Sequence, residues 1–198
     1  MKPKDIIIAA ILILIITSLL SGCSSAEKIT EETAPAEVTS PAIESLVKKA
    51  EAVQKDAKLI LQADKSGNQL KVKVSIDNPS SKPVTSVQAW LSFDTSVLSG
   101  STINTEGSAF DIRAPYEKDF DNTSGLVMLG RSNSSPVTDK QIYVGEVDFS
   151  VIGDSTIFIN AYDYRDDLSG HSSANVIVDG QPYNILQKPE SPALVIQK

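Results

Sequence analysis

From Lys58 onward, apolar residues alternate with polar ones, and this pattern limits the fold more than any other feature of the sequence. The clearest alternating runs are Leu70–Ile76 and Val87–Phe93. Because successive side chains of a strand point to opposite faces, each run predicts a strand with one buried and one solvated face. The period is that of strands and not of helices.

Similar runs continue almost to the last residue. They predict further strands at Leu59–Leu61, Leu126–Arg131, Tyr143–Ile152, Thr156–Tyr162, Ala174–Val178, Tyr183–Leu186 and Ala193–Ile196. Turn-forming pairs such as Gly67-Asn68 and Asp179-Gly180 separate the runs. About nine short strands, with turns roughly every ten residues and no helix between them, predict an all-β fold. We expect an antiparallel β-sandwich of the jelly-roll or immunoglobulin-like type.

The first 22 residues have the layout of a secretory signal, with Lys2 and Lys4 ahead of the apolar run Ile6–Leu20. The run ends in Leu20-Ser21-Gly22-Cys23, which matches the bacterial lipobox. We therefore expect residues 1–22 to be a lipoprotein signal peptide and Cys23 to be lipidated. The alternative is an uncleaved N-terminal anchor in which Cys23 has no role. Either form anchors the chain to the cell membrane and places the rest on the extracytoplasmic side, at the cell surface or in the periplasm.

Residues 23–40 are rich in Ser, Thr, Ala, Glu and Pro, which predicts a flexible tether. Such a coil spans on the order of 20–25 Å. Residues 41–56 have Pro at the first helical position and apolar residues three and four apart, which predicts a short helix. We expect this helix to be a stalk; the alternative is that its apolar stripe docks on the next domain or on a partner. Residues 57–198 form the predicted sandwich domain.

The charge and the few reactive side chains of the chain disfavour several function classes. A net charge of -7 opposes contact with the phosphates of nucleic acids. One Cys and one His do not suffice for a disulfide or for most Cys- and His-based metal sites. His171 lies in a polar loop, and the sequence lacks a Gly-x-Ser-x-Gly elbow, a phosphate-binding Gly-rich loop and an HExxH motif. We therefore expect a protein that is not an enzyme and needs no cofactor.

Several strand sequences resemble those of a cohesin domain, in the same order. Ala57–Leu61 and Gly67–Asn78 are similar to the cohesin start, where a Gly precedes a strand of alternating valines that ends in Asn. Val84–Leu98 is similar to the stretch in which a strand ends in an aromatic-Asp pair, a small turn and Val-Leu. Gly125–Leu129 and Gly145–Val151 look like two later strands. The resemblance implies a sandwich related to family 2 and family 3 carbohydrate-binding folds and a dockerin-like protein partner.

Trp90 is the strongest single pointer to a binding surface. If the apolar residues of Val87–Phe93 face the core, the only tryptophan of the chain faces outward. An exposed Trp is a common interface anchor. The alternative is that the helix or a loop covers Trp90, or that a bulge turns it inward.

The resemblance adds further site residues to Trp90. In cohesins this strand belongs to the sheet that docks the dockerin, and its outward residues make the contacts. Carried over by position, this implies partner-binding roles for Ser86, Gln88, Trp90, Arg131 and Asn133.

Three other functions remain as alternatives. A module for polysaccharide binding or degradation stacks sugar rings on a row of aromatics, and the candidates are Trp90, Tyr116, Tyr143, Tyr162, Tyr164 and Tyr183. Calcium binding is a weaker case, because Asp119–Gly125 and Asp163–Asp167 cluster oxygen ligands without matching an EF-hand loop. The third alternative is a structural envelope lipoprotein.

Overall fold

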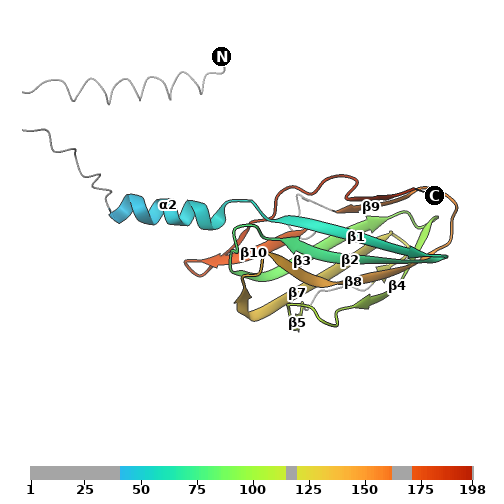
Figure 1. Ribbon diagram of the computed structural model, residues 1–198, viewed down its shortest axis with the longest axis horizontal. Helices are drawn as coiled ribbons and strands as arrows, with labels where there is room; N and C mark the ends of the chain where they lie inside the picture. The colour runs from blue at the N-terminus through green and yellow to red at the C-terminus, as the bar shows by residue number, and fades with distance from the viewer. Residues whose placement is uncertain (1–40, 115–119, 162–170, 198) are drawn as a thin grey trace, which may run out of the picture. The chain divides into compact units, whose positions relative to one another are not determined.

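The computed structural model describes residues 41–114, 120–161 and 171–197, and it contains two β-sheets packed face to face (Figure 1). The first sheet has four strands in the order β1-β2-β8-β4. Their bounds are β1 (Lys58–Ser66), β2 (Gln69–Asp77), β8 (Gln141–Val151) and β4 (Leu98–Asn104). All neighbouring strands in this sheet are antiparallel.

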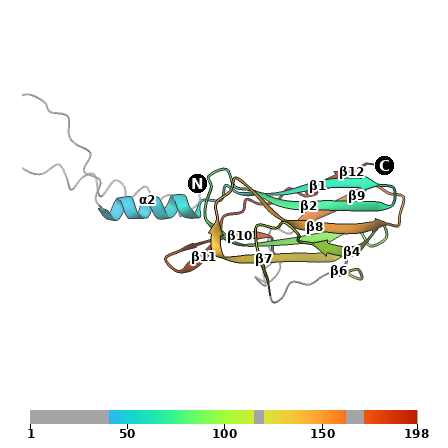
Figure 2. The ribbon, with the colours of Figure 1, turned by 60° about the horizontal axis from the view of Figure 1, so that its bottom comes forward.

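The second sheet has eight strands and is built around β3 (Val84–Phe93) and β7 (Leu126–Val137). The other strands are β5 (Ile112–Arg113), β6 (Phe120–Asp121), β9 (Ile157–Ala161), β10 (Ser173–Val178), β11 (Gln181–Asn184) and β12 (Leu194–Ile196). The main path is β11-β10-β3-β7-β5, while β9 joins β3 to β12 and β6 pairs with β7. Figure 2 shows the two layers, with β1, β2 and β8 in one and β7 and β10 in the other.

The core lies between the two sheets and consists of the alternating apolar residues. The apolar side chains of Leu70–Ile76, and those of Val87, Ala89 and Leu91, have no exposed surface. Phe149 of β8 joins the layers, because its ring centroid lies 5.1 Å from that of Phe93 in β3 and 5.6 Å from that of Phe120 in β6. Both ring pairs meet edge to face, a favourable arrangement for aromatic rings.

The prediction of an all-β sandwich with a short helix is confirmed. Every predicted strand is present, although some are longer or shifted, such as β7, which continues to Val137. β4, β5 and β6 are not predicted from the sequence. Leu98–Asn104 is mostly small and polar, and the other two strands have only two residues each. Pairing with β8 and β7 makes these segments extended, and local sequence does not encode that pairing.

The helix α2 (Pro41–Val53) begins at the expected proline and ends three residues before the predicted end. It contacts the β10–β11 hairpin, where Lys49 Nζ lies 2.8 Å from Asp179 Oδ2. Leu46 and Val47 of its apolar stripe remain 67% and 49% exposed. Leu46 and Val47 therefore do not dock on the sandwich, and the roles of stalk and of partner-binding helix both stay predictions.

Lys82 of the sandwich binds the segment that follows α2, at Gln54 and Asp56. Its Nζ lies 2.9 Å from Asp56 Oδ1 and donates a hydrogen bond to Gln54 O at 2.6 Å. Ser80 Oγ donates to the other oxygen of Asp56. The Lys82 side chain is only 9% exposed, so the ion pair is largely shielded from water.

We expect acid to weaken this junction. Burial raises the pKa of the Asp56 carboxyl, but the hydrogen bond from Ser80 and the charge of Lys82 lower it more, so the pKa lies below its ordinary value. A carboxyl of this kind stabilises the fold above its unfolded pKa, and the contribution is lost as the pH falls through the folded pKa. Between about pH 6 and about pH 2, the free energy of unfolding should fall more in the native chain than in Asp56→Asn. Urea titrations at each pH measure the unfolding free energy of the native chain and of Asp56→Asn. An equal decrease in the two proteins would contradict the role of the Asp56–Lys82 ion pair.

The predicted signal peptide, the lipidated Cys23 and the tether lie outside the described residues. Within the described ranges, no helix is long and apolar enough to cross a membrane. The lipid anchor and the domain boundaries stay predictions.

Candidate binding face

β3 presents uncharged side chains on the outer side of the eight-stranded sheet. Its core-facing residues are Val87, Ala89, Leu91 and Phe93, and its outward residues are Ser86, Gln88, Trp90 and Ser92. All four outward residues are half-buried. The alternation expected for this strand is present, and no bulge turns Trp90 inward, since it pairs in register with Met128.

The neighbouring strands continue this uncharged surface. Residues opposite one another in an antiparallel pair share a face, so the strand register identifies the other outward residues. They are Ile112 of β5, Leu126, Met128, Gly130 and Ser132 of β7, Phe158 and Asn160 of β9, Ser173, Asn175 and Ile177 of β10, Pro182 and Asn184 of β11, and Val195 of β12. We call these residues and the outward residues of β3 the neutral face. Among the outward residues described in these paired stretches of the sheet, the only charged one is Asp121 of β6.

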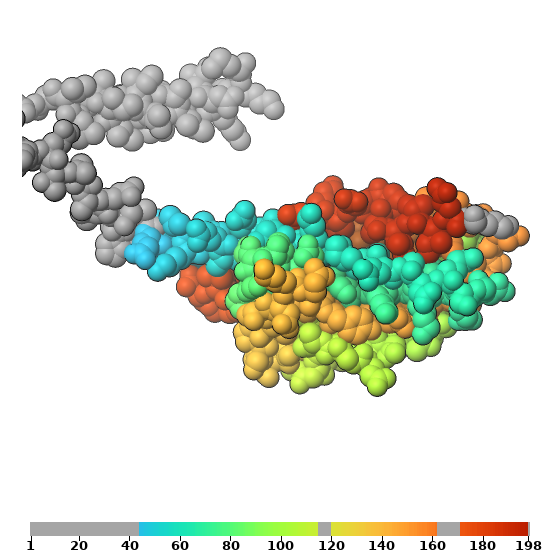
Figure 3. All heavy atoms as spheres, in the orientation of Figure 1, coloured from blue at the N-terminus to red at the C-terminus, as the bar shows by residue number. Residues whose placement is uncertain are grey.

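The outer side of the four-stranded sheet has the opposite character. Its charged residues are Lys58, Asp64, Lys71, Lys73, Asp77, Glu146 and Asp148. Opposite charges lie across from each other on neighbouring strands: Lys58 is opposite Asp77, and Lys73 is opposite Glu146. Figure 3 shows β1, β2 and β8 side by side on the side toward the viewer. We call this surface the charged face, and it has the composition of a solvated sheet surface.

The charges of the charged face are compensated within it. Lys71 Nζ donates to Glu146 Oε1 at 3.2 Å, and this hydrogen bond raises the pKa of Lys71 above its ordinary value. Burial raises the pKa of the Asp148 carboxyl, an effect that the charge of Lys71 partly offsets. Lys71 and Glu146 therefore satisfy one another without a binding partner, whereas Asp148 Oδ1 is buried and accepts no hydrogen bond in the part of the chain that the structure describes.

Trp90 offers an apolar contact. Its ring lies on the same face as Met128, which is only 4% exposed. The indole Nε1 is buried and has no hydrogen-bond partner among the residues that the structure describes. The exposed part of the side chain therefore consists of carbon, and Trp90 can supply buried area to an interface but not a hydrogen bond from its indole.

Polar groups beside Trp90 are held by one another. Asn175 Nδ2 donates to Ser86 Oγ at 3.1 Å and to Ser173 Oγ at 3.2 Å. Ser173 lies directly opposite Gln88. The hydroxyls of Ser86 and Ser173 and the amide of Asn175 are thus fixed before any partner binds.

Arg131 and Asn133 do not lie on the neutral face with the other three predicted site residues. The register places Arg131 opposite Val87, which faces the core. Asn133 follows at a register shift, and its Nδ2 donates to Ala109 O at 3.0 Å. Because the side-chain period of a strand is two, Arg131 leaves β7 on the side opposite to Trp90. The structure brings together Ser86, Gln88 and Trp90 and separates them from Arg131 and Asn133.

The aromatic candidates for sugar stacking do not form a row among the described residues. Trp90 lies on the neutral face, Tyr143 is opposite Ser75 on the charged face, and Tyr183 packs against the core. Tyr116, Tyr162 and Tyr164 lie outside the described residues. The three described rings therefore cannot contact one sugar chain together.

In the described part of Asp119–Gly125, the first calcium candidate, side-chain oxygen atoms accept hydrogen bonds from backbone N–H groups. Asp121 Oδ1 accepts from the amides of Thr123 and Ser124, at 3.0 and 3.1 Å. The side-chain amide of Asn122 bonds both backbone groups of Gly100. Asp119 and the segment Asp163–Asp167 lie outside the described residues. In the described ranges, no three His, Cys, Asp or Glu side chains are grouped to hold a metal ion.

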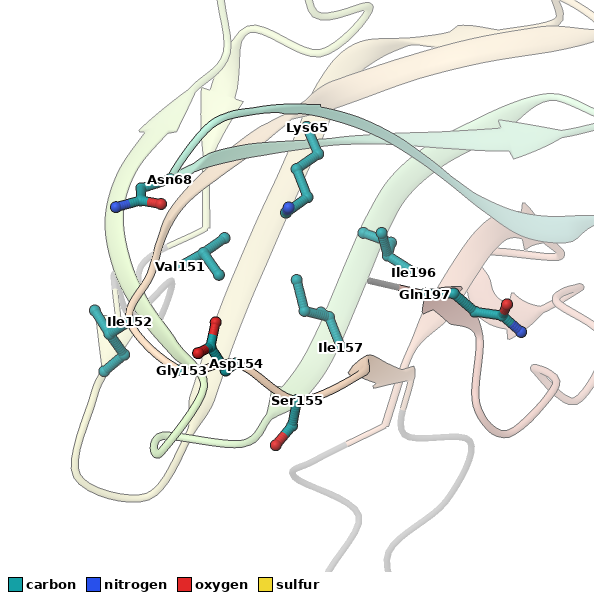
Figure 4. A pocket seen from close by; sticks show the side chains of 10 residues that line it. All are labelled: Lys65, Asn68, Val151, Ile152, Gly153, Asp154, Ser155, Ile157, Ile196 and Gln197. Carbon is teal, nitrogen blue, oxygen red and sulfur yellow. The ribbon is translucent and has the colours of Figure 1, made fainter.

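A pocket of about 250 Å³ opens between the turn that joins β1 to β2 and the segment between β8 and β9 (Figure 4). It is lined by Lys65, Asn68, Val151, Ile152, Gly153, Asp154, Ser155, Ile157, Ile196 and Gln197. None of these residues belongs to the neutral face. The pocket is therefore a separate feature at the end of the sandwich.

Sequence reasoning misses the apolar residues of the neutral face outside β3. Phe158 and Val195 lie directly opposite each other and are 48% and 46% exposed, and Ile177 is 49% exposed. The signal for Phe158 is present, because an aromatic residue stands between the core residues Ile157 and Ile159. No signal in the sequence places β9, β10 and β12 in one sheet with β3.

The fold is a β-sandwich with one charged outer surface and one largely uncharged outer surface. Among solved structures, cohesin modules are similar to the chain. The seventh type I cohesin of ScaB from Pseudobacteroides cellulosolvens is 11% identical, with a TM-score of 0.46 over 66% of this chain and 84% of that one. A type II cohesin of the ScaA adaptor scaffoldin from Acetivibrio cellulolyticus is 16% identical, with a TM-score of 0.45 over 62% and 80%.

The cohesin module of a family 33 glycoside hydrolase from Clostridium perfringens is 9% identical, with a TM-score of 0.47 over 67% of this chain and 92% of that one. No family model matches the sequence, and no curated protein matches it either.

Proposed function

We propose that the chain is a non-catalytic protein-recognition module that binds a dockerin-like partner through the neutral face. The observation that carries the proposal is the contrast between the two outer surfaces of the sandwich. Charges cover one surface, whereas the described outward residues of the other are uncharged except for Asp121 at the end of the sheet. Interface cores are depleted of charge and enriched in aromatic residues, and Trp90 is the aromatic residue of β3 on this face.

The proposal includes a lipid anchor at Cys23. Several acyl chains on one cysteine hold a protein firmly to a membrane, whereas one chain gives only marginal binding. The tether and α2 would then hold the sandwich on the extracytoplasmic side of the membrane. Tethering raises the effective concentration of the neutral face toward partners at the same surface.

A protein ligand has more support than a polysaccharide. Of the three described candidates for sugar stacking, Trp90 lies on the neutral face, Tyr143 lies on the charged face and Tyr183 packs against the core, whereas sugar binding needs rings in a row. The neutral face instead combines separated apolar residues with ordered hydroxyl and amide groups, a composition that fits a protein surface.

A matched pair of Gln→Lys substitutions tests the proposal. Gln88→Lys places a charge beside Trp90 on the neutral face, and Gln62→Lys adds the same charge to the outer side of β1, opposite Lys73. Because an unpaired charge is costly to bury in an interface, Gln88→Lys should reduce capture of a dockerin-like protein roughly tenfold or more. Gln62→Lys should leave it unchanged.

The measurement uses the full chain in detergent as bait for secreted and envelope proteins, followed by titration of the captured protein. Equal capture by native chain and Gln88→Lys would contradict the assignment of the neutral face. Recovery of a polysaccharide and no protein would favour the carbohydrate alternative, and recovery of neither would favour a structural role.

A further inference from the structure

The neutral face contains a break in backbone pairing at Trp90. β10 pairs with β3 as far as Gln88, where it ends at Ser173, and β9 pairs with β3 only from Leu91 onward. Trp90 lies between these two stretches. Its backbone groups on this side of β3 therefore have neither strand as a partner.

The hydroxyl of Ser172 takes the place of the missing strand. The backbone N–H of Trp90 donates to Ser172 Oγ at 3.1 Å, and Ser172 Oγ donates to Trp90 O at 3.2 Å. A serine hydroxyl has one proton to donate and lone pairs to accept, so it can make both bonds at once. Ser172 satisfies both backbone groups of the residue that carries the anchor ring.

The surroundings of Ser172 make this contact hard to replace. Ser172 is only 1% exposed, so solvent has little access to the two backbone groups that it bonds. A buried backbone group without a partner is destabilising, and a backbone shift that brings the group to solvent or to another partner recovers part of that free energy. Loss of the Ser172 hydroxyl would therefore displace the backbone of Trp90, and with it the ring.

We infer that Ser172 is a positioning residue for partner binding: its hydroxyl fixes the backbone of Trp90 where β9 and β10 part, and so holds the ring in its binding orientation. The effect of Ser172 on partner binding rests on the proposed function, whereas its effect on the position of the Trp90 ring does not. The two parts can be tested separately, because Trp90 is the only tryptophan and its fluorescence reports on that position alone.

The first test compares Ser172→Ala with Ser173→Ala in the full chain in detergent. Ser173 is a matched control, because it is also buried, at 3% exposure, but its hydroxyl contacts Asn175 and not the backbone of Trp90. Ser172→Ala should raise the acrylamide quenching constant of Trp90 about twofold and shift its emission to longer wavelength, because a released ring gains access to solvent. Ser173→Ala should leave both quantities unchanged. An unchanged spectrum in Ser172→Ala overturns the inference.

The second test measures the dissociation constant of the captured protein. Ser172→Ala should weaken binding roughly five- to tenfold, mainly through faster dissociation. If the spectrum changes and the affinity does not, Ser172 fixes Trp90 but the partner does not use the ring. If Trp90→Ala also leaves the affinity unchanged, the proposed function itself fails, while the structural role of Ser172 stands.

A third measurement needs no variant and covers the case in which Ser172→Ala does not fold. Amide hydrogen exchange of the native chain should show Trp90 protected about as strongly as its neighbours in β3, because Ser172 replaces the missing strand. Exchange of the Trp90 amide at the rate of an unprotected loop overturns the inference.

Discussion

Trp90→Ala should weaken the binding of a protein partner roughly 30-fold, which corresponds to about 2 kcal/mol of binding free energy. Its exposed carbon surface lies on the neutral face, with Met128 of β7 on one side and the gap between β9 and β10 on the other. Interface tryptophans in such central positions carry a large share of the binding energy. The measurement is the dissociation constant of the captured protein with the native chain and with the variant.

Tyr143→Ala is the matched control for this experiment. Tyr143 is a half-buried aromatic residue of β8 on the charged face, opposite Ser75. Its loss should leave the affinity within about twofold of the native value, because it lies on the other side of the sandwich from the neutral face. An equal loss of affinity in both variants would indicate a general effect on folding, and no loss in Trp90→Ala would remove the neutral face as the binding surface.

Phe149→Ala should destabilise the sandwich by about 3–5 kcal/mol, the largest effect on stability that we expect from one substitution. The side chain is fully buried, and its ring contacts those of Phe93 and Phe120. Its loss leaves a cavity at the point where β8 meets the opposite sheet. The free energy of unfolding in urea measures the effect.

Phe149→Leu separates the cavity from any other effect at this site. Leucine keeps most of the apolar volume, so the loss should be only about 1–1.5 kcal/mol. Similar values for Ala and Leu would show that ring packing, and not volume, joins the sheets. A loss below about 1 kcal/mol in Phe149→Ala would contradict the burial of Phe149 between the sheets.

The two substitutions also distinguish binding from folding. Trp90 is half-buried and lies outside the core, so its loss should lower the unfolding free energy less than the loss of Phe149, whereas Phe149 has no exposed atom for a partner to contact. A substitution that weakens binding without a large loss of stability is therefore expected only on the neutral face.

The candidate site was predictable only within one strand. In β3 the alternation of Val87, Ala89 and Leu91 decides which side chains face outward, and the structure agrees for Ser86, Gln88 and Trp90. β7 lacks this information, because Leu126–Leu129 are all apolar and either face could be the buried one. The pairing with β3 decides the question and turns Arg131 away from Trp90.

The sequence by itself determined the all-β class, the core-facing residues of β2 and β3 and the outward position of Trp90, because side-chain alternation is a local property of a strand. Only the tertiary structure decided that β5, β7, β9, β10, β11 and β12 extend the surface of β3, and that Ser172 bonds the backbone of Trp90. These contacts join residues far apart in the chain, such as Trp90 and Ser172. Strand order and register come from the packing of the whole sandwich, which no single segment encodes.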